Sequence, residues 1–359
     1  MKRAIDLAVR AKGLTYPNPC VGAVVAHGRR IVGYGYHKKS GGPHAEVEAL
    51  RAAGDSARGA DLYVTLEPCD HFGKTPPCTE AIIASGIRRV FVPTRDPNPM
   101  VKGKGIRRLR REGIEVYVGL CSKEARRINE EYFKYMLTGQ PFVTLKIAQT
   151  LDGKVALRDG RSKWVTSASA RRVAKAFRAQ AQAVLIGINT VLADDPMLLP
   201  VPLRKGFIRC VLDTNLRIPP QSRLVRTAKS WTTIIYCASS PVARRKRLEG
   251  MGVIVQKVGQ DKSGRVAIDH VLEDLAERGV MHVMVEGGGM VLTSFMSSGY
   301  FDKLLVFVAP KIFGNRDSLP AFVDLDVDDT SGYPLRIDET KAVGQDLMMI
   351  LYPARRLHV

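Results

Sequence analysis

The sequence predicts an α/β protein built from two domains, and three observations support this. Stretches with apolar residues at helical spacing alternate with short β-branched runs along the 359 residues, which is typical of sheets covered by helices. A Gly-then-Pro stop signal at residues 138–141 ends a long helical pattern. The length suffices for two hydrophobic cores. We therefore expect a first domain over residues 1–140 and a second, larger one over residues 141–359.

The elements of the first domain alternate between helix and strand. Helices are expected at residues 2–12, 45–53, from 78 onward and at 123–137. Strands are expected at residues 21–26, 30–36, 61–66, 89–93 and 114–118, with the first two forming a hairpin. This order predicts a three-layer α/β/α sandwich around a mixed sheet.

The second domain repeats the alternation on a larger scale. Strands are expected at residues 142–148, 183–188, 208–212, 231–237, 253–257, 282–285, 303–309 and 347–351. Helices are expected at residues 169–180, 242–249, 267–278 and 290–298. The pattern predicts a second α/β domain.

The composition is that of a globular protein, with 45% hydrophobic and 25% charged residues. No apolar run approaches the roughly 18 residues of a membrane span, and the N-terminus has no signal-peptide core. Six cysteines over this length do not form a disulfide framework. We expect a reducing, cytoplasmic compartment.

The net charge of +20 suits nucleic acid, but it also suits a small phosphorylated substrate and a phosphorylated cofactor. The basic residues are dispersed. Their short runs at residues 107–111 and 244–247 contain no aromatic residue, as expected of solvated helix faces. We therefore expect no nucleic-acid partner.

One stretch carries metal-ligand chemistry. His44, Cys69 and Cys78 supply one imidazole and two thiols, which is the ligand set of a catalytic zinc site with a fourth position for water. Glu46, two residues after the histidine, can move protons between that water and a ring nitrogen. H-x-E followed by P-C and a second Cys is the signature of zinc deaminases of amino-pyrimidines and nucleobases.

Two alternatives to this interpretation stay open. His71 can complete a closed, structural zinc site, and the cysteines can be plain buried residues beside a lone histidine. Many zinc deaminases have P-C-x-x-C, whereas here the insert at residues 70–77 separates the two cysteines. The insert has the composition of a shaped loop that also touches substrate.

The motifs together resemble the bifunctional riboflavin-biosynthesis deaminase/reductase family. They are Asn18-Pro19-Cys20-Val21-Gly22-Ala23-Val24, Gly42-Pro43-His44-Ala45-Glu46, Thr65-Leu66-Glu67-Pro68-Cys69 and Gly73-Lys74-Thr75-Pro76-Pro77-Cys78. The resemblance implies a cytidine-deaminase-like first domain that binds its pyrimidine through Asn18, His37, Lys74, Asp96 and Asn98. Taken alone, the stretches around Asn18 and Asp96 are plain turn chemistry.

The second domain has no Rossmann fingerprint and no P-loop. Instead, the strand at residues 282–285 runs into Glu286-Gly287-Gly288-Gly289 and a helix. Glycines there let backbone N–H groups approach a phosphate at the helix N-terminus, although a tight strand-to-helix turn explains them equally well. Residues 192–196, taken alone, are just a helix end.

The order of motifs in this half resembles the reductase half of the same family. These motifs are residues 145–148 with 151–154, 162–166, 177–180, 190–196, 285–288 and 309–311. The resemblance implies a dihydrofolate-reductase-like fold. It implies NADPH near Ala148, Trp164, Thr190, Asp194, Thr214, Gly288, Gly289, Met290, Val291, Leu292, Thr293 and Ser294. It implies substrate near Ser162, Arg178, Leu198, Arg204 and Glu286.

The two arginines in the substrate set are expected there for different reasons. Arg178 suits a bidentate clamp on the substrate phosphate. The family places another arginine close after Ala-Asp-Asp-Pro-x-Leu, and here the nearest one is Arg204.

We therefore expect a bifunctional enzyme that uses zinc and NADPH. The first domain deaminates a phosphoribosylaminopyrimidine with Glu46 as proton carrier, and the second reduces its sugar to a ribityl chain. In the second domain we expect only binding residues, because orientation beside the nicotinamide supplies much of the rate. The rivals are a nucleic-acid base deaminase with an appended domain and a zinc-stabilised nucleic-acid-binding protein. A homo-oligomer stays open.

Overall fold

The structure is a computed structural model that describes the chain except residues 74, 159–164, 326–331 and 355–359. It divides the chain into two compact units, Met1–Gly139 and Gln140–Val359. Among the described residues, no helix is long and apolar enough to cross a membrane.

The first unit contains one mixed sheet of five strands in the order β2-β1-β3-β4-β5. Its strands are β1 (Gly22–His27), β2 (Arg30–Tyr36), β3 (Asp61–Val64), β4 (Arg89–Val92) and β5 (Glu115–Val118). Strand β1 pairs antiparallel with β2 and β3, whereas β3, β4 and β5 are parallel. The predicted hairpin and mixed sheet are confirmed.

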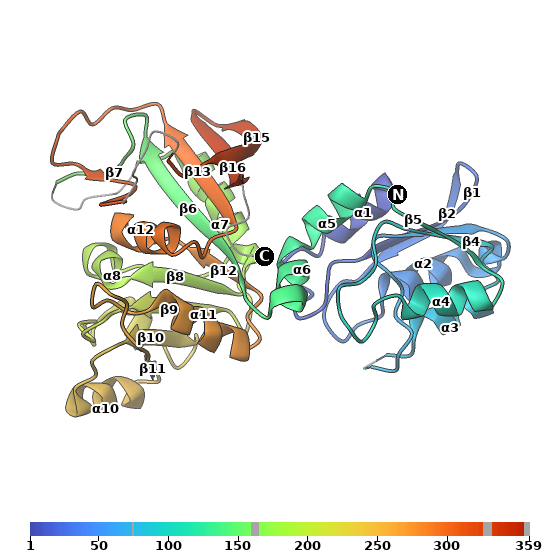
Figure 1. Cartoon of the computed structure of the whole chain (residues 1–359), viewed down its shortest axis with the longest axis horizontal. Helices are drawn as coiled ribbons and strands as arrows, with labels where there is room; N and C mark the ends of the chain where they lie inside the picture. The colour runs from blue at the N-terminus through green and yellow to red at the C-terminus, as the bar shows by residue number, and fades with distance from the viewer. Residues whose placement is uncertain (74, 159–164, 326–331, 355–359) are drawn as a thin grey trace. The chain divides into compact units, whose positions relative to one another are not determined.

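Helices lie on both sides of this sheet, as the three-layer prediction requires (Figure 1). One side carries α1 (Lys2–Val9) and α5 (Ser122–Ile128), and the other α2 (Ala45–Ala53), α3 (Cys78–Ala84) and α4 (Lys104–Arg111). The short 3-10 helix Gly54–Ala57 follows α2. Glycines in β2 bring α2 close to the sheet, because a Cβ on Gly33 would lie 2.3 Å from the Ala49 carbonyl oxygen. This packing fixes the start of α2, where His44 and Glu46 lie.

The single helix expected at residues 123–137 is wrong. The structure has α5 and then α6 (Glu130–Thr138), separated by Asn129 with φ −124° and ψ 25°. The side chain of Asn129 bonds the backbone of Cys20, a contact from a distant part of the chain that helical periodicity does not reveal. The helix expected at residues 2–12 likewise ends at Val9.

The second unit is organised around a nine-stranded sheet in the order β11-β10-β9-β8-β12-β6-β13-β16-β15. Seven strands are parallel: β6 (Phe142–Thr150), β8 (Ala183–Gly187), β9 (Ile208–Leu212), β10 (Thr233–Cys237), β11 (Ile254–Lys257), β12 (His282–Val285) and β13 (Lys303–Ala309). Strands β15 (Leu335–Val343) and β16 (Asp346–Pro353) extend it antiparallel. A separate pair joins β7 (Lys154–Ala156) to β14 (Leu319–Pro320).

Every strand expected in this half is present, whereas β7, β14 and β15 were not predicted. The four expected helices are α7 (Ala168–Gln180), α10 (Val242–Gly250), α11 (Ile268–Glu277) and α12 (Gly289–Ser297). The structure adds α8 (Ile188–Asp194) and α9 (Arg223–Arg226). Strand β15 escapes prediction because most of its residues are exposed and polar, which leaves no period-2 hydrophobic pattern.

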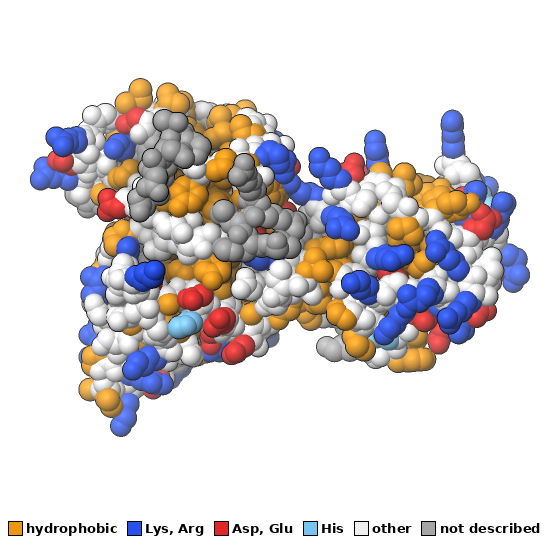
Figure 2. All heavy atoms as spheres, in the orientation of Figure 1, with side chains coloured by type: hydrophobic (Ala, Val, Ile, Leu, Met, Phe, Trp, Pro, Cys, Tyr) orange, Lys and Arg blue, Asp and Glu red, His pale blue; other side chains and the backbone are white. Residues whose placement is uncertain are grey.

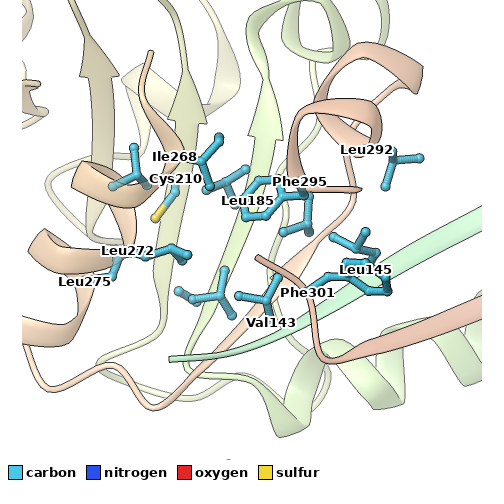
Figure 3. Close-up of a cluster of buried hydrophobic side chains, with 14 of the residues drawn as sticks. Val143, Leu145, Leu185, Cys210, Ile268, Leu272, Leu275, Leu292, Phe295 and Phe301 are labelled. Atoms are coloured by element: carbon cyan, nitrogen blue, oxygen red, sulfur yellow. The ribbon is translucent and has the colours of Figure 1, made fainter. Parts of the chain in front are cut away.

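The two faces of the large sheet bury separate apolar clusters. On one face, Leu272 and Leu275 of α11 and Phe295 of α12 pack against Leu145 and Leu185 of the strands (Figure 3). The opposite face packs against α8, α9 and α10 in one cluster and against α7 in another. Helices therefore cover both faces of the sheet, and side chains that point alternately to either face along each strand are buried, as in other parallel sheets of this kind.

Candidate functional sites

The first unit brings three metal-ligand side chains together. His44 precedes α2, Cys69 follows β3, and Cys78 begins α3. Their ligand atoms all lie within 4.8 Å of one another. The Nδ1 atom of His44 is 3.0 Å from the sulfur of Cys78 and 3.6 Å from that of Cys69. Three parts of the fold thus converge on one point.

The arrangement suits zinc. Bond lengths of roughly 2.0–2.3 Å in a tetrahedral site place ligand atoms roughly 3.5–3.8 Å apart, close to the spacing seen here. The hydrogen bond between the two thiols lowers the pKa of Cys69 and, with burial, raises that of Cys78, so that Cys69 is the one favoured as thiolate, the form that binds metal. Within the described residues, His71 is not part of the metal-ligand group. The closed four-ligand alternative therefore has no support.

Glu46 lies in the first turn of α2, two residues after His44, with only 4% of its surface exposed. Burial, and then the charge of Cys69, raises the pKa of Glu46 to about 7. A carboxyl group that exchanges a proton near neutrality suits general acid–base chemistry. Its position on the cavity wall, outside the ligand group, suits a proton carrier.

A cavity of about 270 Å³ opens beside these residues. Its lining includes His44, Glu46 and Cys69 together with the substrate residues expected in this unit and described by the structure, which are Asn18, His37, Asp96 and Asn98. Lys74 lies outside the described residues. The structure therefore brings four of the five expected substrate residues to one cavity with the metal cluster.

His37 and Asn18 orient each other at this wall. The Nδ1 atom of His37 donates to the Pro43 carbonyl at 3.0 Å, which leaves Nε2 to accept from the Asn18 amide at 3.1 Å. Burial lowers the pKa of His37, so the ring is neutral at pH 7 and keeps this tautomer. The plain-turn interpretation of Asn18 leaves out this role of its side chain.

The loop after β4 is held by residues that the sequence did not single out. Buried Glu67 accepts backbone N–H bonds from Asp96, Gly103 and Ile106 at 2.9–3.2 Å. Tyr132 of α6 donates its hydroxyl to Asp96 Oδ1 at 2.9 Å.

The turn chemistry expected for this loop is also present, because the Asn98 amide oxygen accepts from the Met100 N–H. Glu67 is part of the Leu-Glu-Pro-Cys motif, but its role in holding the loop depends on its burial, which the sequence does not show.

In the second unit, charged side chains gather at the carboxyl edge of the sheet. Arg178 donates to both carboxylate oxygens of Glu286, from Nε at 2.5 Å and from Nη2 at 2.8 Å. Its Nη1 reaches the Leu199 carbonyl at 3.3 Å. Lys146 follows Leu145, whose register partner Val285 directly precedes Glu286. Burial lowers the pKa of Lys146 against the opposing charge of Glu286, and sequence reasoning did not single this residue out.

Edges of this kind are where open α/β sheets bind ligands. The geometry also changes the expectation for Arg178. Its guanidinium fork, expected to clamp a phosphate, is paired with Glu286 in this structure.

The glycine turn after Glu286 leaves space beside a helix N-terminus. A Cβ at Gly288 would meet only Thr190 Oγ1, at 4.0 Å. No side chain caps α12, whose N-terminal N–H groups follow this turn. Open space, uncapped N–H groups and a hydroxyl suit a cofactor phosphate. Thr190, Gly288 and Gly289 therefore lie together at a site that suits a phosphate group of NADPH.

Other expected cofactor and substrate residues hold less direct positions. Leu292 and Leu198 bury their side chains in apolar clusters. Thr293 and Ser294 use their hydroxyls within the fold, on the Val323 N–H and the Met290 carbonyl respectively. Arg204 donates to the Ala181 carbonyl.

The remaining expected residues are placed as follows. Ala148 is half-buried on β6, Asp194 ends α8, and Thr214 lies in the loop after β9. Val291 is half-buried beside the core, whereas Met290 is exposed. Ser162 and Trp164 lie outside the described residues.

Comparison with known proteins covers both units. Residues 1–94 match the model of the cytidine and deoxycytidylate deaminase zinc-binding region, and residues 141–349 match that of the RibD C-terminal domain. The riboflavin biosynthesis protein RibD of Aquifex aeolicus (strain VF5) is 46% identical over 351 residues, which cover 97% of this chain and 96% of that protein. The chain belongs to the RibD family.

Further RibD proteins agree. RibD of Escherichia coli (strain K12) is 38% identical over 330 residues, which cover 88% of each chain. The solved structure of Acinetobacter baumannii RibD, form 1, superposes with a TM-score of 0.87 at 34% identity, covering 99% of this chain and 98% of that one.

A diaminohydroxyphosphoribosylaminopyrimidine deaminase/5-amino-6-(5-phosphoribosylamino)uracil reductase from Thermotoga maritima superposes with a TM-score of 0.84 at 37% identity. The match covers 99% of this chain and 97% of that one.

Membership of the RibD family establishes the general activity. The chain is a bifunctional enzyme of riboflavin biosynthesis that combines a zinc-dependent deaminase with an NADPH-dependent reductase. Its units have the cytidine-deaminase-like and reductase folds that the sequence predicted.

Proposed function

We propose that the first unit, residues 1–140, hydrolytically deaminates the diaminohydroxyphosphoribosylaminopyrimidine named for the Thermotoga homologue. We also propose that residues 141–359 reduce the ribosyl group of the resulting 5-amino-6-(5-phosphoribosylamino)uracil to the ribityl form. The observation that carries the first step is the convergence of His44, Cys69 and Cys78 beside a cavity that His44, Cys69 and Glu46 line.

In the deaminase, His44, Cys69 and Cys78 hold the zinc. When bound, zinc lowers the pKa of water from about 15.7 to roughly 7 and so supplies hydroxide at neutral pH. Glu46 moves the proton, first to the ring nitrogen and then to the leaving amino group, because its carboxylate faces the same cavity.

Asn18, His37, Asp96 and Asn98 hold the pyrimidine and its ribose phosphate, and Lys74 joins them. The mutual hydrogen bond of Asn18 and His37 supports this, since it turns two neutral polar groups toward the cavity. The buried Glu67 and Tyr132 keep the Asp96 loop in place.

In the reductase, NADPH lies along the edge formed by Ala148, Thr190, Asp194, Thr214 and the glycine turn. That turn contributes Gly288, Gly289, Met290, Val291, Leu292, Thr293 and Ser294, and Trp164 joins the site. NADPH supplies hydride to the open-chain imine or aldehyde of the sugar.

Substrate lies against Arg178, Glu286, Leu198, Arg204 and Ser162. The Arg178–Glu286 pair stands at the carboxyl edge beside Lys146 and supports this assignment. These residues bind and orient, and none of them needs to form a covalent bond to the substrate.

We propose small phosphorylated pyrimidines, not nucleic acid, as the partners. Figure 2 shows Lys and Arg side chains scattered over the visible face and interspersed with Asp and Glu. A reducing, cytoplasmic compartment suits the six cysteines, all of which are free. A homo-oligomer is compatible with these assignments.

One experiment tests the assignment of both steps. The purified enzyme receives the phosphoribosylaminopyrimidine with and without NADPH, and the products are identified by mass. Without NADPH we expect replacement of one amino group by oxygen and no further change. With NADPH we expect the same product with two added hydrogens. Tight, strongly salt-dependent binding of DNA or RNA without either product would favour the nucleic-acid rivals.

A further inference from the structure

Asn129 holds a loop of the deaminase pocket by its backbone. It lies between α5 and α6 and is 2% exposed. Its Oδ1 accepts from the Cys20 N–H at 2.7 Å, and its Nδ2 donates to the Cys20 carbonyl at 2.8 Å. Both polar atoms of the amide are therefore used on one backbone position 109 residues away.

Cys20, the residue that Asn129 holds, is close in sequence to a residue of the cavity. Cys20 is two residues after Asn18, whose amide lines the cavity and bonds His37 at 3.1 Å. Asn129 itself is not among the residues that line the cavity. Any effect of Asn129 on deamination must therefore be indirect.

The same helix corner also contacts a second polar residue of the cavity. Tyr132, one turn further along α6, donates to Asp96 Oδ1 at 2.9 Å. The start of α6 is thus connected to two polar parts of the cavity, the loop that carries Asn18 and the side chain of Asp96. The break in the helix at Asn129 is what lets its side chain leave the helical path and reach Cys20.

The attachment of this corner to the fold does not depend on Asn129 alone. Lys12 donates to Glu131 Oε2 and to the Ile128 carbonyl, both at 2.8 Å, and both groups are mostly buried. One contact therefore joins the corner to the turn after α1, while the other reaches the pocket loop. The two can be removed separately.

We propose that Asn129 is a positioning residue of the deaminase, which sets the Asn18 amide against the pyrimidine. This inference rests on the proposed substrate role of Asn18. A residue acting through Asn18 must lose its influence once the Asn18 side chain is gone, because a loop without that amide has no group left to position.

The test is a double-mutant cycle in the full-length enzyme with Asn129→Ala, Asn18→Ala and the double variant. We expect Asn129→Ala to raise the KM for the aminopyrimidine or lower kcat, reducing kcat/KM about tenfold or more. In the Asn18→Ala background, the same change should alter kcat/KM less than about twofold. Zinc content and reduction of the deaminated substrate should stay at the wild-type level.

Lys12→Met is the matched control, because it removes the other contact of the same corner. It should lower the melting temperature while leaving kcat/KM of the folded enzyme unchanged. If Asn129→Ala does not fold, Asn129→Asp goes through the same cycle, since it keeps the acceptor for the Cys20 N–H.

Three outcomes overturn the inference and are distinguishable. If Asn18→Ala impairs deamination and the effect of Asn129→Ala is undiminished in the double variant, positioning through Asn18 is wrong while the proposed function stands. Normal deamination by Asn18→Ala removes the substrate role of Asn18, and the inference falls with it. Equal losses of kcat/KM in Lys12→Met and Asn129→Ala would likewise reduce Asn129 to a structural role.

Discussion

Buried carboxylates around the deaminase cavity have different tasks because their hydrogen-bond partners differ. Glu67 accepts three backbone N–H bonds and so organises a loop. Asp96 accepts from the Asn98 N–H and from the Tyr132 hydroxyl. Glu46 lies beside the metal cluster with a pKa raised to about 7, chiefly by burial. Burial also raises the pKa of Asp96, to about 6, so the position of Glu46 beside the metal cluster is what makes it the group best suited to exchange protons during the reaction.

Glu46→Gln should fold and keep its zinc but lose deamination by about 10²-fold or more, because an amide of the same shape cannot carry a proton. Reduction of already deaminated substrate should be unchanged. Product analysis with each substrate, together with metal analysis, checks this. Near-normal deamination would move the proton transfer to another residue, with His71 the next candidate on the cavity wall.

Cys69→Ser and Cys78→Ser should each lose most of the zinc, which we expect at about one per chain in the wild type. A serine hydroxyl is not deprotonated at neutral pH and is a poor ligand beside a thiolate. Metal analysis of purified protein measures the loss. Cys20→Ser serves as the control, because Cys20 is buried but outside the ligand group. Active wild-type enzyme without zinc would contradict the assignment.

At the scale of elements, the Arg178–Glu286 pair ties α7 to the loop after β12. Arg178→Ala leaves the Glu286 carboxylate buried without its partner, which costs about 3–5 kcal/mol of stability for a buried pair. We therefore expect a lower urea midpoint for the second unit as well as weaker substrate binding. The double variant Arg178→Met with Glu286→Gln should recover part of the stability. An unchanged midpoint in Arg178→Ala would show that the pair contributes little to folding.

The turn before α12 is a place where a substitution should weaken cofactor binding without affecting folding. Gly288 has φ −71° and ψ 174°, which any residue adopts, and the space at its Cβ is open. Gly288→Val should therefore fold, yet weaken NADPH binding by blocking the approach of a phosphate to the backbone. Titration with NADPH and with substrate decides this. Weaker substrate binding with unchanged NADPH binding would reverse the assignment of the two sides of the pocket.

Most elements were predictable because their patterns are local. The helix at residues 45–53 coincides with α2, which buries residues at helical spacing. The strand at residues 208–212 coincides with β9, a short run that is buried on both faces. Strand β15 lacked that pattern. The break at Asn129 is set by a partner in another segment. Sequence periodicity therefore predicts neither strand β15 nor the break at Asn129.

The candidate sites divide in the same way. Metal ligands were visible because zinc chemistry restricts residue type and spacing. The roles of Glu67, Tyr132 and Lys146 depend on burial and on long-range neighbours, so nothing local marked them. Arg178 was recognised as a fork-shaped cation, but its pairing with Glu286 became visible only in the folded chain.

At the scale of the whole molecule, each unit has its own core. Among the described residues, the apolar clusters around the first sheet draw on residues before Gly139, and those around the second sheet draw on residues after Gln140. The metal cluster lies in the first unit and the glycine turn in the second. Since a core and a site belong to each unit, folding and ligand binding should separate along the same line.

Residues 140–359 produced alone should therefore bind NADPH with an affinity close to that of the full chain. Residues 1–139 should bind zinc but not NADPH. Isothermal titration and metal analysis of both pieces check this, and the Gly288→Val form of residues 140–359 is the control for specific cofactor binding. We expect this because Thr190 and the uncapped start of α12 are held by β8, β12 and the apolar clusters beneath them, all of which the second piece retains. A folded second piece that binds NADPH only when the first is added would contradict this, because the cofactor site would then need the first unit for its completion.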